Sequence, residues 1–185
     1  LFTLEVTDAD APANHTSTDT VRVQVYPQGT QLLEMSPESD TYVRAFDYAD
    51  ANYGGSSSVQ ANGGSFNDPR EAWFRFDLAG LEGNIIDAEL HLLPVAVNSA
   101  TATFDVNRVE DDLWNEYSLK WNNRPASGAL IGTVLPVDGA VTIVDLDDAW
   151  LKEQQTLDGV ASLRIAPGAG ANALASWHSR ESNQP

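Results

Sequence analysis

Arg70-Glu-Ala-Trp-Phe-Arg-Phe-Asp-Leu78 is the stretch of the sequence that decides the fold. Successive side chains of a β-strand point to opposite faces of its sheet. From Ala72 to Leu78, one face of this stretch is entirely apolar: Ala72, Phe74, Phe76 and Leu78. The other face carries Trp73, Arg75 and Asp77. The stretch therefore predicts a strand with one face on a hydrophobic core and the opposite face available for polar contacts or a ligand.

Short alternating runs of this kind recur on both sides of the stretch, separated by turn residues. Together with it they are Thr41 to Arg44, Ser57 to Ala61, Ala72 to Leu78, Ala88 to Val95, Thr101 to Val109, Val141 to Leu146, Ser162 to Ala166 and Ala175 to Arg180. They predict an all-β fold, a two-sheet antiparallel β-sandwich of the jelly-roll type. Asp147 to Gln155 is expected to form one short helix that closes an end of the sandwich.

The first part of the chain has a different pattern. Phe2 to Val6 and Thr20 to Val25 read as two strands joined by a polar loop, and the pattern resembles the last hairpin of an immunoglobulin-like or cadherin-like repeat. Two strands cannot hold a core alone, so we expect residues 1–26 to be the end of a truncated neighbouring repeat. Residues 27–37 are expected to be a linker and residues 38–185 the sandwich.

The charge of the chain limits its partners. It has 27 acidic and 10 basic residues and a formal net charge of −17. Nucleic acid and anionic membrane surfaces would be repelled by such a chain, so neither is expected as a partner. The sequence has no cysteine, no leader and no apolar run long enough to cross a bilayer, and it reads as a piece excised from a longer protein.

Alternation along the strands gives a candidate binding surface. The side chains expected to face outward are Tyr42, Arg44, Trp73, Arg75, His91, His178 and Arg180. The arginine fork matches a carboxylate or a sulfate, and an aromatic ring accepts the C–H face of a sugar, so this set predicts a shallow site for an acidic polysaccharide. Two alternatives stay open: each arginine could simply pair with a neighbouring carboxylate, and a loop could cover Trp73. Arg124 is expected to brace its own loop.

A structural calcium ion is a further expectation. The loop Asp47-Tyr-Ala-Asp-Ala-Asn52 offers the oxygen ligands that calcium prefers, although its spacing is not that of an EF-hand. Asp50 and Asn52 are the first candidates for ligands.

The order of these segments from Asp40 to the end of the chain resembles the DNRLRE-domain family, which includes alginate-binding carbohydrate-binding modules. The segments that carry the resemblance are Asp40-Thr-Tyr-Val-Arg44, Tyr48-Ala-Asp-Ala-Asn-Tyr-Gly54, Arg70 to Leu78, Ala88-Glu-Leu-His-Leu92, Asp111-Asp-Leu-Trp-Asn115, Trp121-Asn-Asn-Arg-Pro125, Val144-Asp-Leu146 and Ser179-Arg-Glu181. The resemblance implies a β-sandwich attached to a carbohydrate-active enzyme, often with calcium, in secreted or surface-bound bacterial proteins. The chain has only two lysines, so a lysine-rich alginate site does not carry over.

The function expected from the sequence is non-catalytic. The chain would be a monomeric module of a secreted or cell-surface protein from a marine bacterium, and it would anchor a linked polysaccharide lyase or glycoside hydrolase to an acidic polysaccharide. Alginate is the first candidate, and ulvan, porphyran, carrageenan and fucoidan are alternatives. A structural spacer domain and a lyase fragment built on Tyr42, Arg75 and His91 are the competing hypotheses, but no recognised catalytic motif is present.

Overall fold

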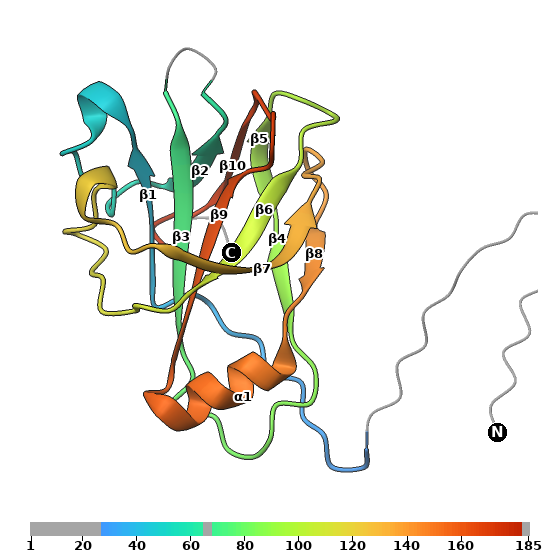
Figure 1. Ribbon diagram of the computed structural model, residues 1–185. Helices are drawn as coiled ribbons and strands as arrows, with labels where there is room; N and C mark the ends of the chain where they lie inside the picture. Colours follow the sequence, from blue (N-terminus) through green and yellow to red (C-terminus); the bar gives the residue numbers. More distant parts are fainter. Residues whose placement is uncertain (1–26, 65–67, 183–185) are drawn as a thin grey trace, which may run out of the picture. The chain divides into compact units, whose positions relative to one another are not determined.

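Strands dominate the described part of the chain, residues 27–64 and 68–182 of the computed structural model (Figure 1). The chain separates into two units, Leu1–Glu34 and Met35–Pro185, and every named element belongs to the second. The strands are β1 Ser39–Arg44, β2 Ser58–Asn62, β3 Arg70–Asp77, β4 Glu89–Leu92, β5 Pro94–Val97, β6 Phe104–Val109, β7 Ser127–Val134, β8 Thr142–Asp145, β9 Val160–Pro167 and β10 Leu174–His178. The helices are α1 Asp148–Leu157 and the two 3-10 turns η1 Phe46–Tyr48 and η3 Trp121–Asn123. The hairpin expected within residues 1–26 lies outside the described residues.

The strands form two antiparallel sheets. The larger sheet has the order β5-β10-β2-β3-β9-β6-β7, with β1 also paired to β3, and the smaller sheet is β4 with β8. β3 pairs β9 along Ala72–Asp77, but it meets β2 only through Asn62 and Arg70. Buried side chains from both sides of this weak junction, and from β4 and β8, belong to one core. The predicted β-sandwich is therefore confirmed.

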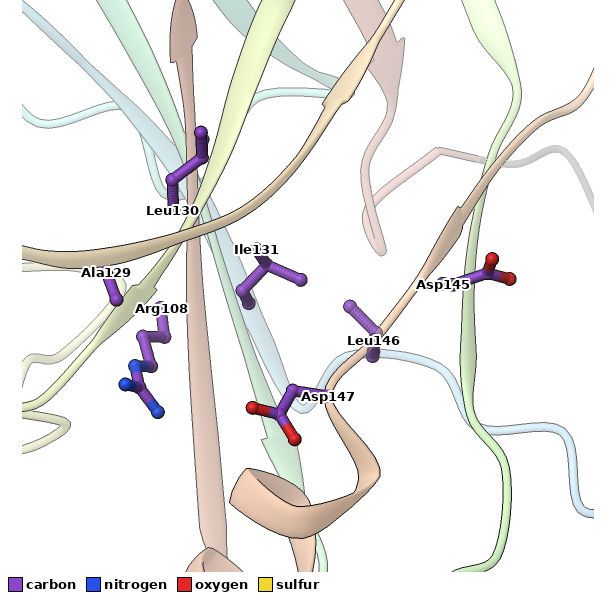
Figure 2. Close-up of a pocket in the computed structure, with 7 residues that line it drawn as sticks. All are labelled: Arg108, Ala129, Leu130, Ile131, Asp145, Leu146 and Asp147. Carbon is purple, nitrogen blue, oxygen red and sulfur yellow. The ribbon is translucent and has the colours of Figure 1, made fainter.

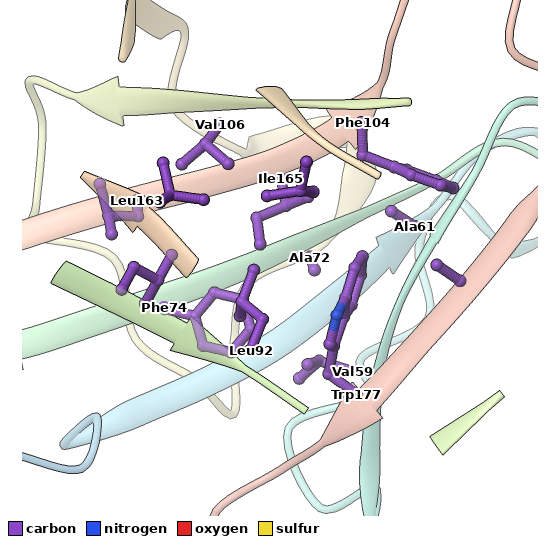
Figure 3. Packing of buried hydrophobic residues seen from close by; sticks show 14 of the residues in the cluster. Val59, Ala61, Ala72, Phe74, Leu92, Phe104, Val106, Leu163, Ile165 and Trp177 are labelled. Carbon is purple, nitrogen blue, oxygen red and sulfur yellow. The ribbon is translucent and has the colours of Figure 1, made fainter. Parts of the chain in front are cut away.

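The core lies where the apolar faces of these strands meet (Figure 3). Ala72 and Phe74 of β3 point into it, as the alternation of the sequence predicts. Phe104 and Trp177 close one part of it, with ring centroids 5.9 Å apart in an edge-to-face arrangement. Burying a large apolar side chain of this kind stabilises the fold by about 2 to 3 kcal/mol.

The expected helix is present as α1, between β8 and β9, and covers one end of the sandwich (Figure 1). Asp147 is its N-cap, and its Oδ1 accepts hydrogen bonds from the backbone N–H groups of Ala149 and Trp150 at 3.0 and 3.2 Å. Trp150 and Leu151 are buried in the core. None of the described helices is long and apolar enough to cross a membrane.

Two strand predictions need correction. The run Ala88 to Val95 is split into β4 and β5 at Leu93, because Pro94 has no backbone N–H to continue the ladder. Ser127–Val134 is not among the predicted runs but forms β7. This strand pairs only with β6, contains two glycines and is mostly half-buried or exposed, so it lacks the alternation by which a strand is recognised in a sequence.

Candidate functional site

The outer face of β3 is covered by residues 110–125, so the expected open platform does not exist. Trp73 points away from the main core, as predicted, but it is fully buried in a second small core. Its ring lies 6.2 Å from that of Trp114 in an edge-to-face contact, and Val109 and Leu119 pack beside them. The exposed position expected for Trp73 is therefore wrong. Alternation gives the face of a side chain, but it does not show which distant loop covers that face.

Arg75 holds this covering loop in place. Its Nη1 donates to the backbone oxygens of Trp114 and, at 3.2 Å, Asp112. Its Nε lies 2.6 Å from Glu38 Oε1. The guanidinium is thus engaged within the protein, as the alternative reading of the sequence allows.

Arg180 has a similar role at the other side of the loop. Its Nη2 lies 2.8 Å from Glu116 Oε2, its Nε lies 3.1 Å from Glu181 Oε1, and its Nη1 donates to the backbone oxygen of Glu38 at 2.7 Å. Arg75 and Arg180 are therefore ion-paired structural residues in this fold.

The two predicted histidines lie apart from these arginines. His91 is exposed on β4, and its Nε2 is 2.9 Å from Glu89 Oε2. His178 is half-buried at the end of β10. β4 pairs β8, and β10 pairs β2 and β5, so neither histidine stands on a strand next to β1 or β3. The seven predicted residues do not form one surface.

Tyr42 and Arg44 lie on the opposite side of β1 from the one expected for them. Val43 was expected in the main core but packs against Trp73, while Tyr42 is paired with Ala72, whose side chain is in the main core. Tyr42 is buried and stacks on Tyr53 with ring centroids 4.4 Å apart. The register of β1 against β3 fixes this side, which the short run Thr41 to Arg44 left ambiguous.

Arg44 takes part in the first of two arginine pairs that share one carboxylate. Its Nε and Nη2 bind the two oxygens of Asp68 at 2.9 and 2.8 Å. Arg70 binds the same carboxylate, with its Nε 3.0 Å from Oδ2. Burial raises the pKa of Asp68, but the hydrogen bonds from Arg70 and Arg44 outweigh it and hold the pKa below its usual value. Asp68 is therefore a fixed negative charge that orients both guanidinium groups.

The second arginine pair shares Glu71. Arg164 Nη2 lies 2.6 Å from Glu71 Oε1, and Arg124 Nε lies 2.9 Å from Oε2. Glu71 is almost fully buried, while both arginines are partly exposed. Among the described residues, Arg124 Nη2 and Arg164 Nε have no hydrogen-bond acceptor. Four of the chain's eight arginines thus share two carboxylates, which leaves two positive charges in excess.

Arg70 of the first pair, and Arg164 and Glu71 of the second, line a shallow hollow of about 370 Å³, which we call the arginine groove. Its lining residues are Asn62, Gly63, Pro69, Arg70, Glu71, Trp121, Arg164, Ala166, Pro167, Gly168, Gly170, Ala171 and Asn172. Arg124 lies beside it, with its guanidinium 3.7 Å from the centroid of the Trp121 ring. A Cβ at Gly63 would lie 1.6 Å from the backbone oxygen of Ala171, so only glycine lets these two loops meet.

The groove has the chemistry to bind an anionic sugar. Arginines with free N–H groups match a carboxylate, and the half-buried indole of Trp121 offers an apolar surface. Arg70, Trp121 and Arg164 were not among the predicted site residues. Arg164 could have been found from the sequence, because Leu163 and Ile165 are core residues and place it on the outer face. Trp121 could not, since its position depends on the fold of the loop.

The residues expected to bind calcium have other contacts. Asn52 Nδ2 donates to the backbone oxygens of Glu116 and Leu119 at 2.7 and 2.9 Å, and its Oδ1 accepts from the N–H of Gly54. Asp50 Oδ1 accepts from Asn122 Nδ2 at 2.9 Å. The described residues contain no group of three acidic or histidine side chains arranged to hold a metal ion. Asp50 and Asn52 thus do not present a preformed ligand set, and calcium binding stays a prediction.

A second hollow, of about 270 Å³, lies between β6, β7 and the start of α1 (Figure 2). Its lining residues are Arg108, Ala129, Leu130, Ile131, Asp145, Leu146 and Asp147. Asp147 caps α1, and Arg108 Nε lies 3.3 Å from Glu110 Oε1. One arginine beside Asp145 and Asp147 gives no excess of positive charge, so this hollow suits an anionic ligand less well than the arginine groove.

Comparison with known proteins adds two findings. The sequence model of carbohydrate-binding module family 96 matches residues 31–185. A Bacillus sp. protein named gellan lyase is 31% identical over 159 residues, which are 81% of this chain. The chain spans only 6% of the length of that relative.

Proposed function

The chain belongs to carbohydrate-binding module family 96, and from this premise we propose that it binds an acidic polysaccharide in the arginine groove. The observation that carries the proposal is the sharing of two buried or nearly buried carboxylates, Asp68 and Glu71, by four arginines. The shared carboxylates hold the guanidinium groups in place before the ligand arrives, so little side-chain freedom is lost on binding. The excess positive charge then attracts a uronate carboxylate or a sulfate.

The biological role that fits this site is anchoring. We propose that the module belongs to a secreted or cell-surface enzyme that degrades polysaccharides, and that it raises the local concentration of substrate around a linked catalytic domain. The small share of the relative's length that the chain spans supports a module within a large protein. Gellan is a candidate ligand through the name of that relative, and alginate is a candidate through the resemblance noted in the sequence.

Arg164→Ala tests the proposal directly. We expect it to weaken binding to an acidic polysaccharide by about tenfold to a hundredfold, because a charge-assisted hydrogen bond contributes roughly 1.5 to 3 kcal/mol. Affinity electrophoresis through gels that contain gellan, alginate, an algal sulfated polymer or a neutral glucan measures the effect. Arg164→Lys keeps the charge without the fork and should bind with intermediate affinity.

Arg108→Ala is the matched control, because it removes the same charge from a residue that lies outside the groove and pairs with Glu110. It should bind like the unchanged protein. Equal retardation of Arg164→Ala and Arg108→Ala would refute the groove as the binding site. If no gel retards the unchanged protein, the structural spacer becomes the better explanation.

A further inference from the structure

Two exposed aromatic side chains lie next to the arginine groove, on the turn η1 that follows β1. Phe46 is 66% exposed and Tyr48 is 46% exposed. Among the described aromatic residues, only Tyr117 is comparably exposed, and it lies on the loop of residues 110–125. Most of the described aromatic side chains are buried, so an exposed pair on one short turn requires an explanation.

The backbone at Phe46 is strained. Its φ is 54°, and it is the only residue other than glycine with a positive φ in the described part of the chain. A bulky side chain in this region destabilises the fold by about 1 to 2 kcal/mol. Since the ring is mostly exposed, its packing offsets little of this destabilisation. A strained backbone whose side chain adds little packing is typical of a ligand-binding position.

The ring of Tyr48 is held in place by Arg44. The Arg44 guanidinium lies 3.6 Å from the centroid of its ring, and Arg44 is fixed in turn by its two bonds to Asp68. One face of the Tyr48 ring is therefore covered by Arg44, while the exposed part of the ring remains open to solvent. A preordered aromatic ring of this kind accepts the C–H face of a sugar with little loss of side-chain freedom.

Two sets of contacts join this turn to the arginine groove. Asp68 connects Arg44, below Tyr48, with Arg70, which lines the groove. Asn122 of η3, which follows Trp121 of the groove, donates its backbone N–H to the oxygen of Ala49 at 3.3 Å and its Nδ2 to Asp50 Oδ1 at 2.9 Å. One polysaccharide chain bound in the groove can therefore continue over η1.

The charge differs between the two places. Arg70, Arg124 and Arg164 surround Asp68 and Glu71 at the groove. Beside Tyr48, the one arginine is Arg44, which is already paired with Asp68, and the neighbouring Asp47 and Asp50 are exposed. A uronate over Tyr48 would be repelled by these carboxylates, whereas an uncharged sugar would not. Resting on the function proposed above, we infer that Phe46 and Tyr48 form a second subsite that takes a neutral sugar of the same chain. The preferred ligand is then an acidic heteropolysaccharide in which neutral sugars separate the uronates, rather than a polymer made of uronates alone.

Tyr48→Ala and Phe46→Ala test the second subsite by titration calorimetry with three probes: gellan oligosaccharides, which mix uronate and neutral sugars, polygalacturonate, in which every sugar is charged, and a neutral glucan. Each substitution should weaken gellan binding roughly fivefold to tenfold, as expected for the loss of one stacking contact. Neither should weaken polygalacturonate binding more than about twofold. Tyr48→Phe keeps the ring and should bind gellan like the unchanged protein.

Tyr117→Ala is the matched control for the loss of an exposed aromatic ring, and thermal unfolding shows that each variant is folded. Equal affinity of the unchanged protein for gellan and polygalacturonate would overturn the inference. So would a Tyr48→Ala variant that binds gellan as well as Tyr117→Ala does. In both cases the loss of binding in Arg164→Ala would still support the arginine groove, so a failure of the second subsite is distinguishable from a failure of the proposed function.

Discussion

At the scale of single residues, the most unusual groups are two buried carboxylates, Asp40 and Glu116, which both contact Arg180. Glu116 and Asp40 are almost fully buried, and Glu116 Oε1 and Asp40 Oδ1 have no hydrogen-bond partner among the described residues. Burial raises the pKa of Glu116 to about 7, and Glu181 and Asp40 add repulsion that Arg180 only partly offsets. Burial likewise raises the pKa of Asp40 to about 6. Both acids therefore hold a proton more tightly in the folded protein than in the unfolded chain.

The sign of the resulting pH dependence follows from linkage. A raised pKa contributes stability at low pH, and this contribution is lost as pH rises through the folded value, here between about 5 and 8. We expect Glu116→Gln, which cannot ionise, to gain stability relative to the unchanged protein by about 1 to 2 kcal/mol between pH 5 and pH 8. Urea unfolding at the two pH values measures this difference.

Asp148→Asn is the control for this experiment. Lys152 holds the pKa of Asp148 below its usual value, so Asp148 stays ionised across this range. Its substitution should cost the same at pH 5 and pH 8. A free energy difference between Glu116→Gln and the unchanged protein that does not vary with pH would show that Glu116 is already ionised at pH 5.

At the scale of elements, the strands with a clear apolar face could be predicted from the sequence, and the loops could not. β3 and the helix α1 lie within two residues of their predicted bounds, because alternation and a cap residue are local signals. The loop of residues 110–125 carries no such signal. Its path depends on contacts with residues distant in sequence, such as Asn52 and Arg75, which the sequence alone does not pair.

Asn52 is the residue that best tests how this loop is held. Asn52→Ala removes both hydrogen bonds to the loop and leaves the buried oxygens of Glu116 and Leu119 without a donor, so we expect a loss of about 2 to 3 kcal/mol in the free energy of unfolding. Asn122→Ala, which removes one exposed contact with Asp50, should cost less. Both are measured by urea unfolding.

The same urea unfolding experiments, repeated in calcium and in EDTA, also test the predicted calcium site. The loss in Asn52→Ala should be the same in both if its amide acts only through the loop. A stabilisation by calcium that disappears in Asp50→Ala would instead establish the site expected from the sequence.

At the scale of the whole molecule, the arginines and aromatic rings of the chain are arranged differently from the surface that the sequence predicts. Arginine beside aromatic rings in an acidic chain predicted an anion site over Trp73, but the arginines and the Trp121 ring of the proposed site lie around Glu71, at the end of the same face that the loop leaves uncovered. Arg44 is the predicted residue that lies next to the groove. The sequence alone could not distinguish Arg75 and Arg180 from Arg44, because Arg75 pairs with Glu38, 37 residues away, and Arg180 pairs with Glu116, 64 residues away, as well as with the adjacent Glu181.

The net charge of the molecule and the charge of its groove act against each other on an acidic ligand. The net charge of −17 repels a polyanion over long distances, while the groove attracts it at contact. Salt screens the distant repulsion first, since the Debye length falls from about 30 Å at 0.01 M to about 10 Å at 0.1 M. Higher salt then weakens the contacts themselves. We therefore expect the affinity for an acidic polysaccharide to rise with sodium chloride up to about 0.1 M and to fall beyond it.

Calorimetric titrations of Arg164→Ala and Arg108→Ala at a series of salt concentrations separate the effect of the net charge from that of the groove arginines. Both variants have the same net charge, so the increase in their affinity with salt below about 0.1 M should be the same. The fall at high salt should be shallower in Arg164→Ala, because it has lost an arginine contact in the groove. A steady fall from the lowest salt would mean that the net charge has no effect on binding, and a steady rise would mean that the arginines of the groove do not contact the ligand.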